Sequence, residues 1–418
     1  MLAIISDLHL TDGSTCDTLN EGAFRQFLRT LAGVAESACW RRRPGHDEGV
    51  FEPLERIDLL LLGDILDVMR SEYWLESAVR PWSPPAQLAP VVHEITRRIL
   101  RHNNPAFAQL RALGGLLPVV ATHDGRTHFI PLHIHYLVGN HDWPFHLKGE
   151  AWDAVRRDIC AAMALANNPA QPFAHQPQED PAIAALCRQH RLHAEHGDIH
   201  DPVNYQQEKG RDHASLGDAV VVEILNQFPR RVREELALDA AHPLARAFHE
   251  ADNIRPLLAL PQYLLAASRH FGSKAQQEKI HQLWTEASQP FLDLPFVHAL
   301  DKPWQWDTVD TLQTFFRFQQ ATSLGLQAQL SRFFQRFAQA ETYREQALRA
   351  AEAAQADTVV YGHTHHAELV ALGARAREGR RVEQLYVNTG TWRSQHAPVL
   401  QADGSFPFVN YHAMTHAF

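Results

Sequence analysis

The stretch of sequence from residue 2 to residue 9 reads LAIISDLH. A short apolar run that ends in a carboxylate and an imidazole is typical of a buried strand with functional side chains at its carboxyl end. A second such run, Ile57–Leu62, is closed by Asp64. A third run, His133–Val138, leads into Asn140. Since helical periodicity alternates with these runs, the sequence predicts an α/β fold or a layered α/β/β/α arrangement.

The other elements are predicted from the same patterns. Phe24, Phe27 and Leu31 recur at helical spacing and predict an amphipathic helix over residues 21–40. Residues 73–113 contain a Pro-Pro pair followed by a helical pattern, and we expect them to lie over one edge of the sheet. Further strands are expected at residues 116–121, 192–196, 358–361, 369–372, 382–388, 399–400 and 408–411.

The pattern changes between about residue 205 and residue 354, where strand signals stop and long helical periodicities replace them. Strands resume afterwards, so both ends of this helical segment must return to one sheet. We therefore expect a discontinuous core over 1–204 and 356–418, with a smaller insertion at about 71–114. Residues 205–355 would form a large helical insertion, a cap that restricts access to the site below it.

The composition narrows the class of protein. With 45% hydrophobic and 21% charged residues, the chain is typical of globular proteins. No apolar run approaches the roughly 18 residues of a membrane span, and no basic region precedes the first apolar run, so we expect a cytoplasmic protein. Four cysteines without a C-x-x-C spacing favour neither a disulfide framework nor a zinc knuckle. The net charge of -9 argues against a surface built to attract nucleic acid.

The unusual feature of the composition is histidine, of which the chain has 27. Several histidines follow apolar runs, where loops of an α/β sheet can direct side chains to one pocket. Carboxylates, an amide oxygen and imidazoles, without a thiolate, suit Mn, Fe, Zn or a similar divalent metal. The candidate ligands are too many for one tetrahedral ion and fit two ions sharing a carboxylate. They are Asp7, His9, Asp64, Asn140, His196, His363 and His365.

The order of these motifs resembles that of the calcineurin-like metallophosphoesterase superfamily. The motifs are D-x-H, G-D-x-x-D, G-N-H-D, H-G-D and G-H-T-H, at residues 7–9, 63–67, 139–142, 196–198 and 362–365. The resemblance covers about residues 1–70, 115–204 and 356–415 and does not include the helical insertion. It implies a four-layer α/β/β/α metallophosphoesterase sandwich with a metal pair at one edge.

The resemblance also implies a role for each motif residue. One metal would be held by Asp7, His9 and His365, the other by Asn140, His196 and His363, and Asp64 would bridge them. His141 would protonate the leaving oxygen or stabilise phosphoryl charge, and Asp142 or Asp67 would orient imidazoles. His141 and Asp142 are therefore the expected catalytic residues, and a metal-bridging hydroxide would attack phosphorus in line.

Two divalent metal ions are thus the expected cofactors. Nitrogen and oxygen donors accept Mn, Fe, Co, Ni or Zn, and selection in the cell depends on availability as much as on affinity. We favour Mn.

The substrate stays open among several phosphoesters. The motifs look like a bacterial branch that includes UDP-diacylglucosamine pyrophosphatases, but those are shorter and usually carry arginine where this chain has His141. An intact histidine there is similar to general phosphodiesterases, nucleases and phosphatases. We expect hydrolysis of a phosphodiester or pyrophosphate bond in a small or lipid-linked substrate. The alternatives are a nuclease for DNA or RNA, a lipid pyrophosphatase and a non-catalytic metal-binding scaffold.

A few residues outside the motifs have more than one interpretation. His200 either lines the substrate side or faces solvent, and Asp201 beside it is equally open. The phenylalanines of the insertion favour helix packing over a substrate box. Basic residues near the start of the insertion could approach a substrate phosphate. These two sets are Phe315, Phe316, Phe318, Phe333, Phe334 and Phe337, and Lys209, Arg211, Arg230, Arg231 and Arg233.

Overall fold

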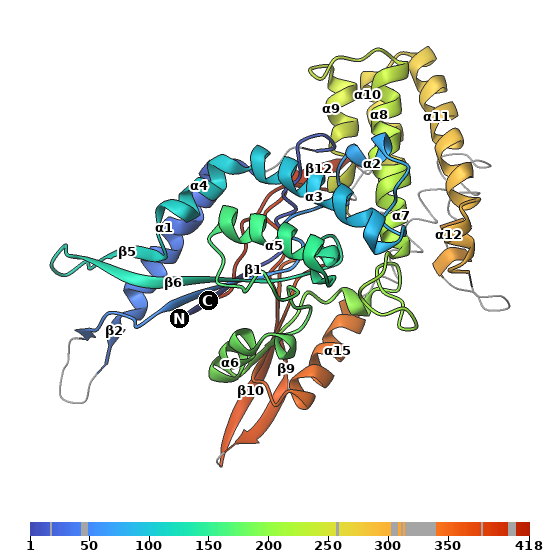
Figure 1. Ribbon diagram of the computed structural model, residues 1–418. Helices are drawn as coiled ribbons and strands as arrows, with labels where there is room; N and C mark the ends of the chain where they lie inside the picture. Colours follow the sequence, from blue (N-terminus) through green and yellow to red (C-terminus); the bar gives the residue numbers. More distant parts are fainter. Residues whose placement is uncertain are drawn as a thin grey trace.

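The structure is a computed structural model with a mixed α/β architecture, built on two four-stranded sheets that contain parallel strand pairs (Figure 1). The described residues are 1–16, 19–42, 49–255, 259–301, 308–310, 312–313, 340–377, 379–399 and 407–418. No helix among these residues is long and apolar enough to cross a membrane.

The first sheet has the order β1-β4-β6-β5. Its strands are β1 (Leu2–Ile5), β4 (Ile57–Leu62), β6 (Thr127–Leu137) and β5 (Leu116–Val120). β1, β4 and β6 are parallel, and β5 pairs with β6 as an antiparallel hairpin. Because the carboxyl ends of the three parallel strands meet at one edge, the loops that carry Asp7, Asp64 and Asn140 begin side by side.

The second sheet has the order β7-β8-β10-β9. Its strands are β7 (Leu192–Ala194), β8 (Thr358–Tyr361), β10 (Arg380–Asn388) and β9 (Glu368–Arg377). β7, β8 and β10 are parallel, and β9 pairs antiparallel with β10. His196 and His363 follow the carboxyl ends of β7 and β8.

An apolar cluster joins the two sheets. Ile4 and Leu60 of the first sheet share this cluster with Ala194 and Val360 of the second, and all four are buried. Side chains alternate along a strand, so the neighbours of these residues point to the opposite faces. The two sheets therefore face each other across this apolar layer.

Helices cover the outer faces. α1 (Glu21–Ala38) contacts β5, and its buried Phe24, Phe27 and Leu31 lie at helical spacing. Its first turn is capped by Asn20, which accepts a hydrogen bond from the backbone N–H of Ala23. The surrounding helices are α3 (Pro85–His102), α4 (Asn104–Ala112) and α5 (Glu150–Met163), with the short α2 (Tyr73–Glu76) before them.

The second sheet is covered by α6 (Pro181–His190), which contacts β7, and by α15 (Ala340–Ala353). Tyr343 and Ala347 of α15 pack against Val359 and Tyr361 of β8. The sequence assigns α15 to the insertion, whereas in the structure it packs against the sheet of the core.

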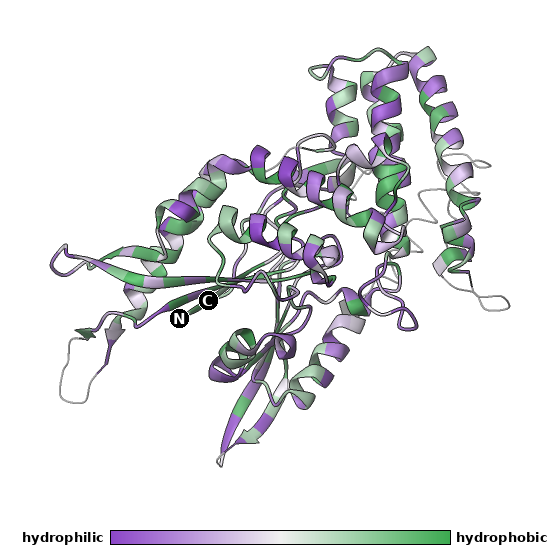
Figure 2. Cartoon of the chain, viewed as in Figure 1, coloured by the Kyte–Doolittle hydropathy of each residue, from purple (hydrophilic) through white to green (hydrophobic). Residues whose placement is uncertain are grey.

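The described part of the insertion is helical, as the periodicity predicts, and contains no strand. The helices are α7 (Leu216–Val220), η4 (Val221–Asn226), α8 (Gln227–Glu235), α9 (Pro243–His249), α10 (Leu260–Phe271), α11 (Lys274–Leu292) and α12 (Pro295–His298). α8, α9, α10 and α11 contact one another (Figure 1), and Figure 2 shows hydrophilic and hydrophobic residues mixed along them. The expected packing of Phe315, Phe316, Phe318, Phe333, Phe334 and Phe337 lies outside the described residues.

The strand predictions are confirmed with some changes of boundary. β9 and β10 extend further toward their common turn than predicted, because hairpin pairing adds exposed polar residues that carry no apolar pattern. Of the strand expected at 399–400, residue 400 lies outside the described residues, and Val399 directly follows β11 (Gln395–Pro398), which pairs with β12 (Phe408–Tyr411). The remaining short elements are β2 (Trp40–Arg41), β3 (Val50–Phe51), η1 (Trp143–His146), η2 (Pro177–Glu179), η3 (Asp198–His200) and η5 (Ala251–Asn253).

Replacement of Trp392 by alanine should destabilise the core. Trp392 is fully buried, packs against Phe24 and Phe27 at ring-centroid distances of 5.8 and 5.0 Å, and donates a hydrogen bond to the carbonyl of Thr415. Loss of a buried tryptophan costs about 3 to 5 kcal/mol, which urea unfolding would measure. Leu369→Ala, at a site 71% exposed, is the control and should change stability by less than about 0.5 kcal/mol. Equal effects of the two substitutions would contradict this packing.

Candidate metal centre

The candidate ligands lie where five parallel strands end. Nine described residues other than glycine have positive φ, and five of them are candidate ligands: Asp7, His9, Asp64, His363 and His365, with φ between 43° and 67°. This left-handed region is unfavourable for residues with a Cβ and is often found at functional sites. The backbone thus turns sharply at these positions and directs their side chains to one place.

Asp7, His9 and His365 form one group of donor atoms. The Nε2 atoms of His9 and His365 are 2.9 Å apart. The Oδ1 atom of Asp7 lies 3.7 Å from Nε2 of His9 and 3.4 Å from Nε2 of His365. Two imidazole nitrogens and a carboxylate oxygen therefore converge on one point.

Asp64, His196 and His363 form a second group, which also includes Asn140. Nε2 of His196 lies 3.1 Å from Oδ2 of Asp64 and 3.2 Å from Oδ1 of Asn140. Nδ1 of His363 lies 2.8 Å from the same Asn140 oxygen. Oδ2 of Asp64 is also 3.7 Å from Nε2 of His9, so this carboxylate lies between the two groups.

The charges of the site are concentrated in a buried volume. Burial alone would raise the pKa of Asp64, but the charges of His196, His141 and His9, with the hydrogen bond to His196, together outweigh it and hold the pKa well below its usual value. Burial opposes protonation of His196, yet the charges of Asp64 and Asp7 raise its pKa to about 10. Burial, and then the charge of Arg255, lower the pKa of His365 to about 3. The carboxylates thus require nearby positive charge.

The donor set fits divalent cations. Carboxylate and amide oxygens with imidazole nitrogens, all directed to two neighbouring points, are the ligands that such metals prefer. A cation at either point would balance the buried carboxylates, as protonated imidazoles otherwise must. Among the described residues, other groups of His and Asp also bring three potential ligand atoms within 4.8 Å of one another.

In most of the candidate ligand histidines, a hydrogen bond holds the ring nitrogen that points away from the other donor atoms. Nδ1 of His9 lies 2.7 Å from Asp67, Nδ1 of His196 lies 3.0 Å from the carbonyl of Leu62, and Nε2 of His363 lies 3.1 Å from Asp201. Such partners set the tautomer and orientation of metal-binding histidines. Asp201, left open by the sequence, is therefore a partner of His363.

His141 lies at the border of the two groups. Its Nδ1 is 2.8 Å from Oδ1 of Asp67, and its backbone N–H donates a hydrogen bond to Oδ1 of Asp64. Its side chain is 17% exposed, against at most 8% for the four histidines of the two donor groups. Among these imidazoles it is therefore the most accessible to a substrate.

Asp142 has different contacts from those expected of it. Its carboxylate accepts hydrogen bonds from the backbone N–H groups of Gly139 and Ile65 and from the hydroxyl of Tyr136. Burial, and then the charge of Asp64, raise its pKa to about 6. Its hydrogen bonds join the loops after β4 and β6, whereas Asp67 is the carboxylate that holds imidazoles.

The structure also shows the contacts of His200 and of the basic residues of the insertion. His200 packs against Tyr361 and Tyr343, with its Nε2 3.4 Å from the Tyr361 hydroxyl. Arg230 and Arg233 lie beside Glu72, Arg231 pairs with Glu235 and Glu286, Arg211 pairs with Asp198, and Lys209 lies over the ring of Phe296. These contacts connect the cations to protein groups outside the two donor groups.

Arg255 is a residue of the site that the sequence did not indicate. It lies in the insertion, and its Nη2 is 2.8 Å from Nδ1 of His365. Its backbone N–H donates to the carbonyl of His396, next to a parallel bridge between Ile254 and His396. Because 110 residues separate Arg255 from His365, no local pattern could have revealed the contact.

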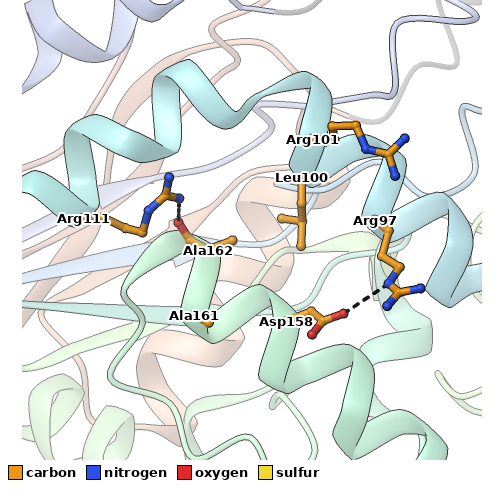
Figure 3. A pocket seen from close by; sticks show the side chains of 7 residues that line it. All are labelled: Arg97, Leu100, Arg101, Arg111, Asp158, Ala161 and Ala162. Carbon is orange, nitrogen blue, oxygen red and sulfur yellow. Dashed lines mark hydrogen bonds and ion pairs between the residues drawn. The ribbon is translucent and has the colours of Figure 1, made fainter.

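A surface pocket lies elsewhere on the molecule, between α3, α4 and α5 (Figure 3). Within it Arg97 lies 3.6 Å from Asp158, and Arg111 donates a hydrogen bond to the carbonyl of Ala162. It includes none of the candidate ligands, so its hollow shape is unrelated to the metal-binding chemistry. Its lining residues are Arg97, Leu100, Arg101, Arg111, Asp158, Ala161 and Ala162.

Comparisons with known proteins add no relative: neither the protein-family models nor the curated proteins give a match for this chain. The functional argument therefore depends on the residues and their geometry.

Replacement of Gly139 by alanine should weaken metal binding. A Cβ at this position would overlap Oδ1 of Asp64 and approach the ring of His196 to 2.7 Å, so both donors must move. We expect the affinity for Mn²⁺, measured by titration calorimetry, to fall by about one to two orders of magnitude. Gly373→Ala on β9, where a Cβ meets no atom within 4 Å, is the matched control. Unchanged affinity in Gly139→Ala would show that these donors do not bind the ion.

Proposed function

We propose that this chain is a metal-dependent phosphoric ester hydrolase of the calcineurin-like metallophosphoesterase type, cleaving a phosphodiester or pyrophosphate bond. The observation that carries the proposal is the position of Asp64 between two groups of donors. One group consists of Asp7, His9 and His365, and the other of Asn140, His196 and His363. Two neighbouring cation sites with a shared carboxylate are the arrangement used for phosphoryl chemistry.

We propose further that the fold is a four-layer sandwich and that the insertion forms a cap. The apolar layer between the sheets, with α1 on one outer side and α15 on the other, supports a four-layer α/β/β/α sandwich. The insertion would form a cap, because Arg255 reaches His365 from it. Contacts between the two insertions, such as Arg80 with Glu223, support a fixed position of the cap over this edge.

When bound, two divalent ions would supply Lewis acidity toward phosphate oxygens and a water of lowered pKa. We favour Mn, and the donor set also accepts Fe, Co, Ni or Zn. The chain itself would orient the donors: Asp67 and the carbonyl of Leu62 hold the imidazoles of His9 and His196 in the tautomers that direct Nε2 inward.

His141 would supply the proton for the leaving oxygen. Its Nδ1 is held by Asp67, so the proton that it can transfer is the one at Nε2. The backbone hydrogen bond from His141 to Asp64 fixes the distance between this imidazole and the cation sites. Asp142 acts as a positioning residue, since its carboxylate joins the loops that carry Asp64 and Asn140.

Hydrolysis of a generic aryl phosphodiester, compared with its monoester, tests this function. The metal-free protein is reloaded with Mn²⁺, and the diester should be hydrolysed faster. His141→Ala should lower kcat by about 10²- to 10⁴-fold with metal content unchanged, because it removes only proton transfer. Asp64→Asn should lower both activity and metal content. His281→Ala, an exposed histidine on α11 that belongs to none of the metal-binding groups among the described residues, is the control and should act like the unaltered chain.

The proposal fails if two ions bind but neither ester is cleaved with Mn, Fe, Co, Ni or Zn. That result would favour a metal-binding scaffold. Cleavage of nucleic acid with salt-sensitive binding would instead redirect the substrate to a nuclease.

Arg255 offers a test of the cap. An imidazole that binds a cation through Nε2 carries its proton on Nδ1, so His365 could not then accept a hydrogen bond from Arg255. The charge of the guanidinium would remain beside this donor group, and a substrate phosphate is a further acceptor that fits it. Arg255→Ala should raise KM for the diester about 10-fold or more, by loss of one charge-assisted hydrogen bond. Arg230→Ala, in the same insertion but paired with Glu234, should leave KM unchanged.

A further inference from the structure

A second group of metal-binding side chains lies outside the candidate metal centre. It consists of His146, His175 and Asp212, called here the lateral cluster. His146 ends η1, His175 precedes η2, and Asp212 lies in the loop between η3 and α7. The three residues come from three separate segments, and no part of the phosphoesterase proposal uses them.

The donor atoms of the lateral cluster converge. Oδ1 of Asp212 lies 2.6 Å from Nδ1 of His146 and 3.2 Å from Nε2 of His175. The two imidazole rings are 4.4 Å apart, tilted by 53°. One carboxylate oxygen thus meets two ring nitrogens, which gives two nitrogen donors and an oxygen donor around one point.

The surroundings of the cluster are those of a ligand set. Nε2 of His146, its second ring nitrogen, lies 3.6 Å from Oε2 of Glu179, within ion-pair distance, and the same oxygen accepts a hydrogen bond from the backbone N–H of His175. His175 is 2% exposed, and its buried Nδ1 has no hydrogen-bond partner among the residues that the structure describes. The polar interactions of this buried ring therefore depend on the side that faces Asp212. The Asp212 side chain is 43% exposed, which leaves an entry path for an ion.

Two imidazoles and a carboxylate, without a thiolate, are a donor set that Zn²⁺ accepts in four-coordinate sites with a water as the fourth ligand. A comparable surface pair, His93 with Asp158, has one imidazole on its carboxylate and belongs to none of the metal-binding groups among the described residues. It provides a natural comparison, since it has the pairing but lacks the third donor.

An ion bound at the lateral cluster would connect segments that lead to the candidate metal centre. His146 lies on the segment that follows Asn140 and His141. The residue before His175, Ala174, accepts a hydrogen bond from the backbone of Val138 at the end of the first sheet. Arg211, next to Asp212, forms an ion pair of 2.6 Å with Asp198. An ion at the lateral cluster would therefore join the segments leading to both donor groups.

We propose that His146, His175 and Asp212 bind one Zn²⁺ ion at a site separate from the candidate metal centre. The site does not depend on the proposed phosphoesterase activity, because none of its residues contributes to the two donor groups.

The test is a zinc count on the full chain. The protein is stripped with a chelator, reloaded with Zn²⁺, freed of excess ion and analysed by elemental mass spectrometry. Asp212→Asn and His146→Gln should each lose about one equivalent relative to the unaltered chain, because a site with only three protein ligands cannot hold the ion when one of them is removed. Asp158→Asn, the matched control, should lose none. The exposed position of Asp212 makes its substitution compatible with folding, which circular dichroism checks.

Additivity separates this site from the metal centre. Asp64→Asn should lower the zinc content independently, and the double variant Asp64→Asn/Asp212→Asn should lose the sum of the two single losses. Equal zinc content in Asp212→Asn, His146→Gln and the unaltered chain would overturn the lateral site, whatever the result for Asp64→Asn. Loss of the same equivalent in Asp158→Asn would also overturn it, since binding would then be nonspecific.

Discussion

The packing of two parallel-strand sheets across one apolar layer is the constraint on which the candidate metal centre depends. Ile4 and Leu60 on one side meet Ala194 and Val360 on the other, and all are buried. Because both sheets present the carboxyl ends of their central strands at the same edge, loops from opposite sheets reach one small volume. Neither sheet alone contains both donor groups. The apolar packing between the sheets therefore fixes where the candidate metal ligands meet, although these apolar side chains bind no metal themselves.

The ligand positions are rigid because their backbone is strained and held. Residues with left-handed φ cost about 1 to 3 kcal/mol each and persist where the surroundings fix them. Asp7 donates its backbone N–H to the carbonyl of Gly63, and its own carbonyl accepts a hydrogen bond from Thr391. His9 donates its N–H to the carbonyl of Asp64. The strands pair with one another just beyond their ends, so the donors keep their places.

The loops and the insertion add what the sheets cannot supply. Asp201 comes from the segment after β7 and orients His363, whereas Arg255 comes from the insertion and lies against His365. Asp67 holds two imidazoles at once, which couples His9 to His141. The two-sheet core would provide the cation sites, and the insertion would provide the contacts that distinguish one anionic ligand from another. This division follows from rigidity, since strands fix positions and loops vary them.

The sequence by itself determined the strands of the core, the helical nature of the insertion and the chemical types at the strand ends. These depend on neighbours within a few residues, and apolar runs and periodicity record them directly. Tertiary structure alone decided that Asp67 and not Asp142 holds imidazoles, that Asp201 belongs to the site, and that Arg255 approaches it. These contacts join residues tens to hundreds of positions apart. They arise from how buried surfaces pack, and no local pattern encodes that packing.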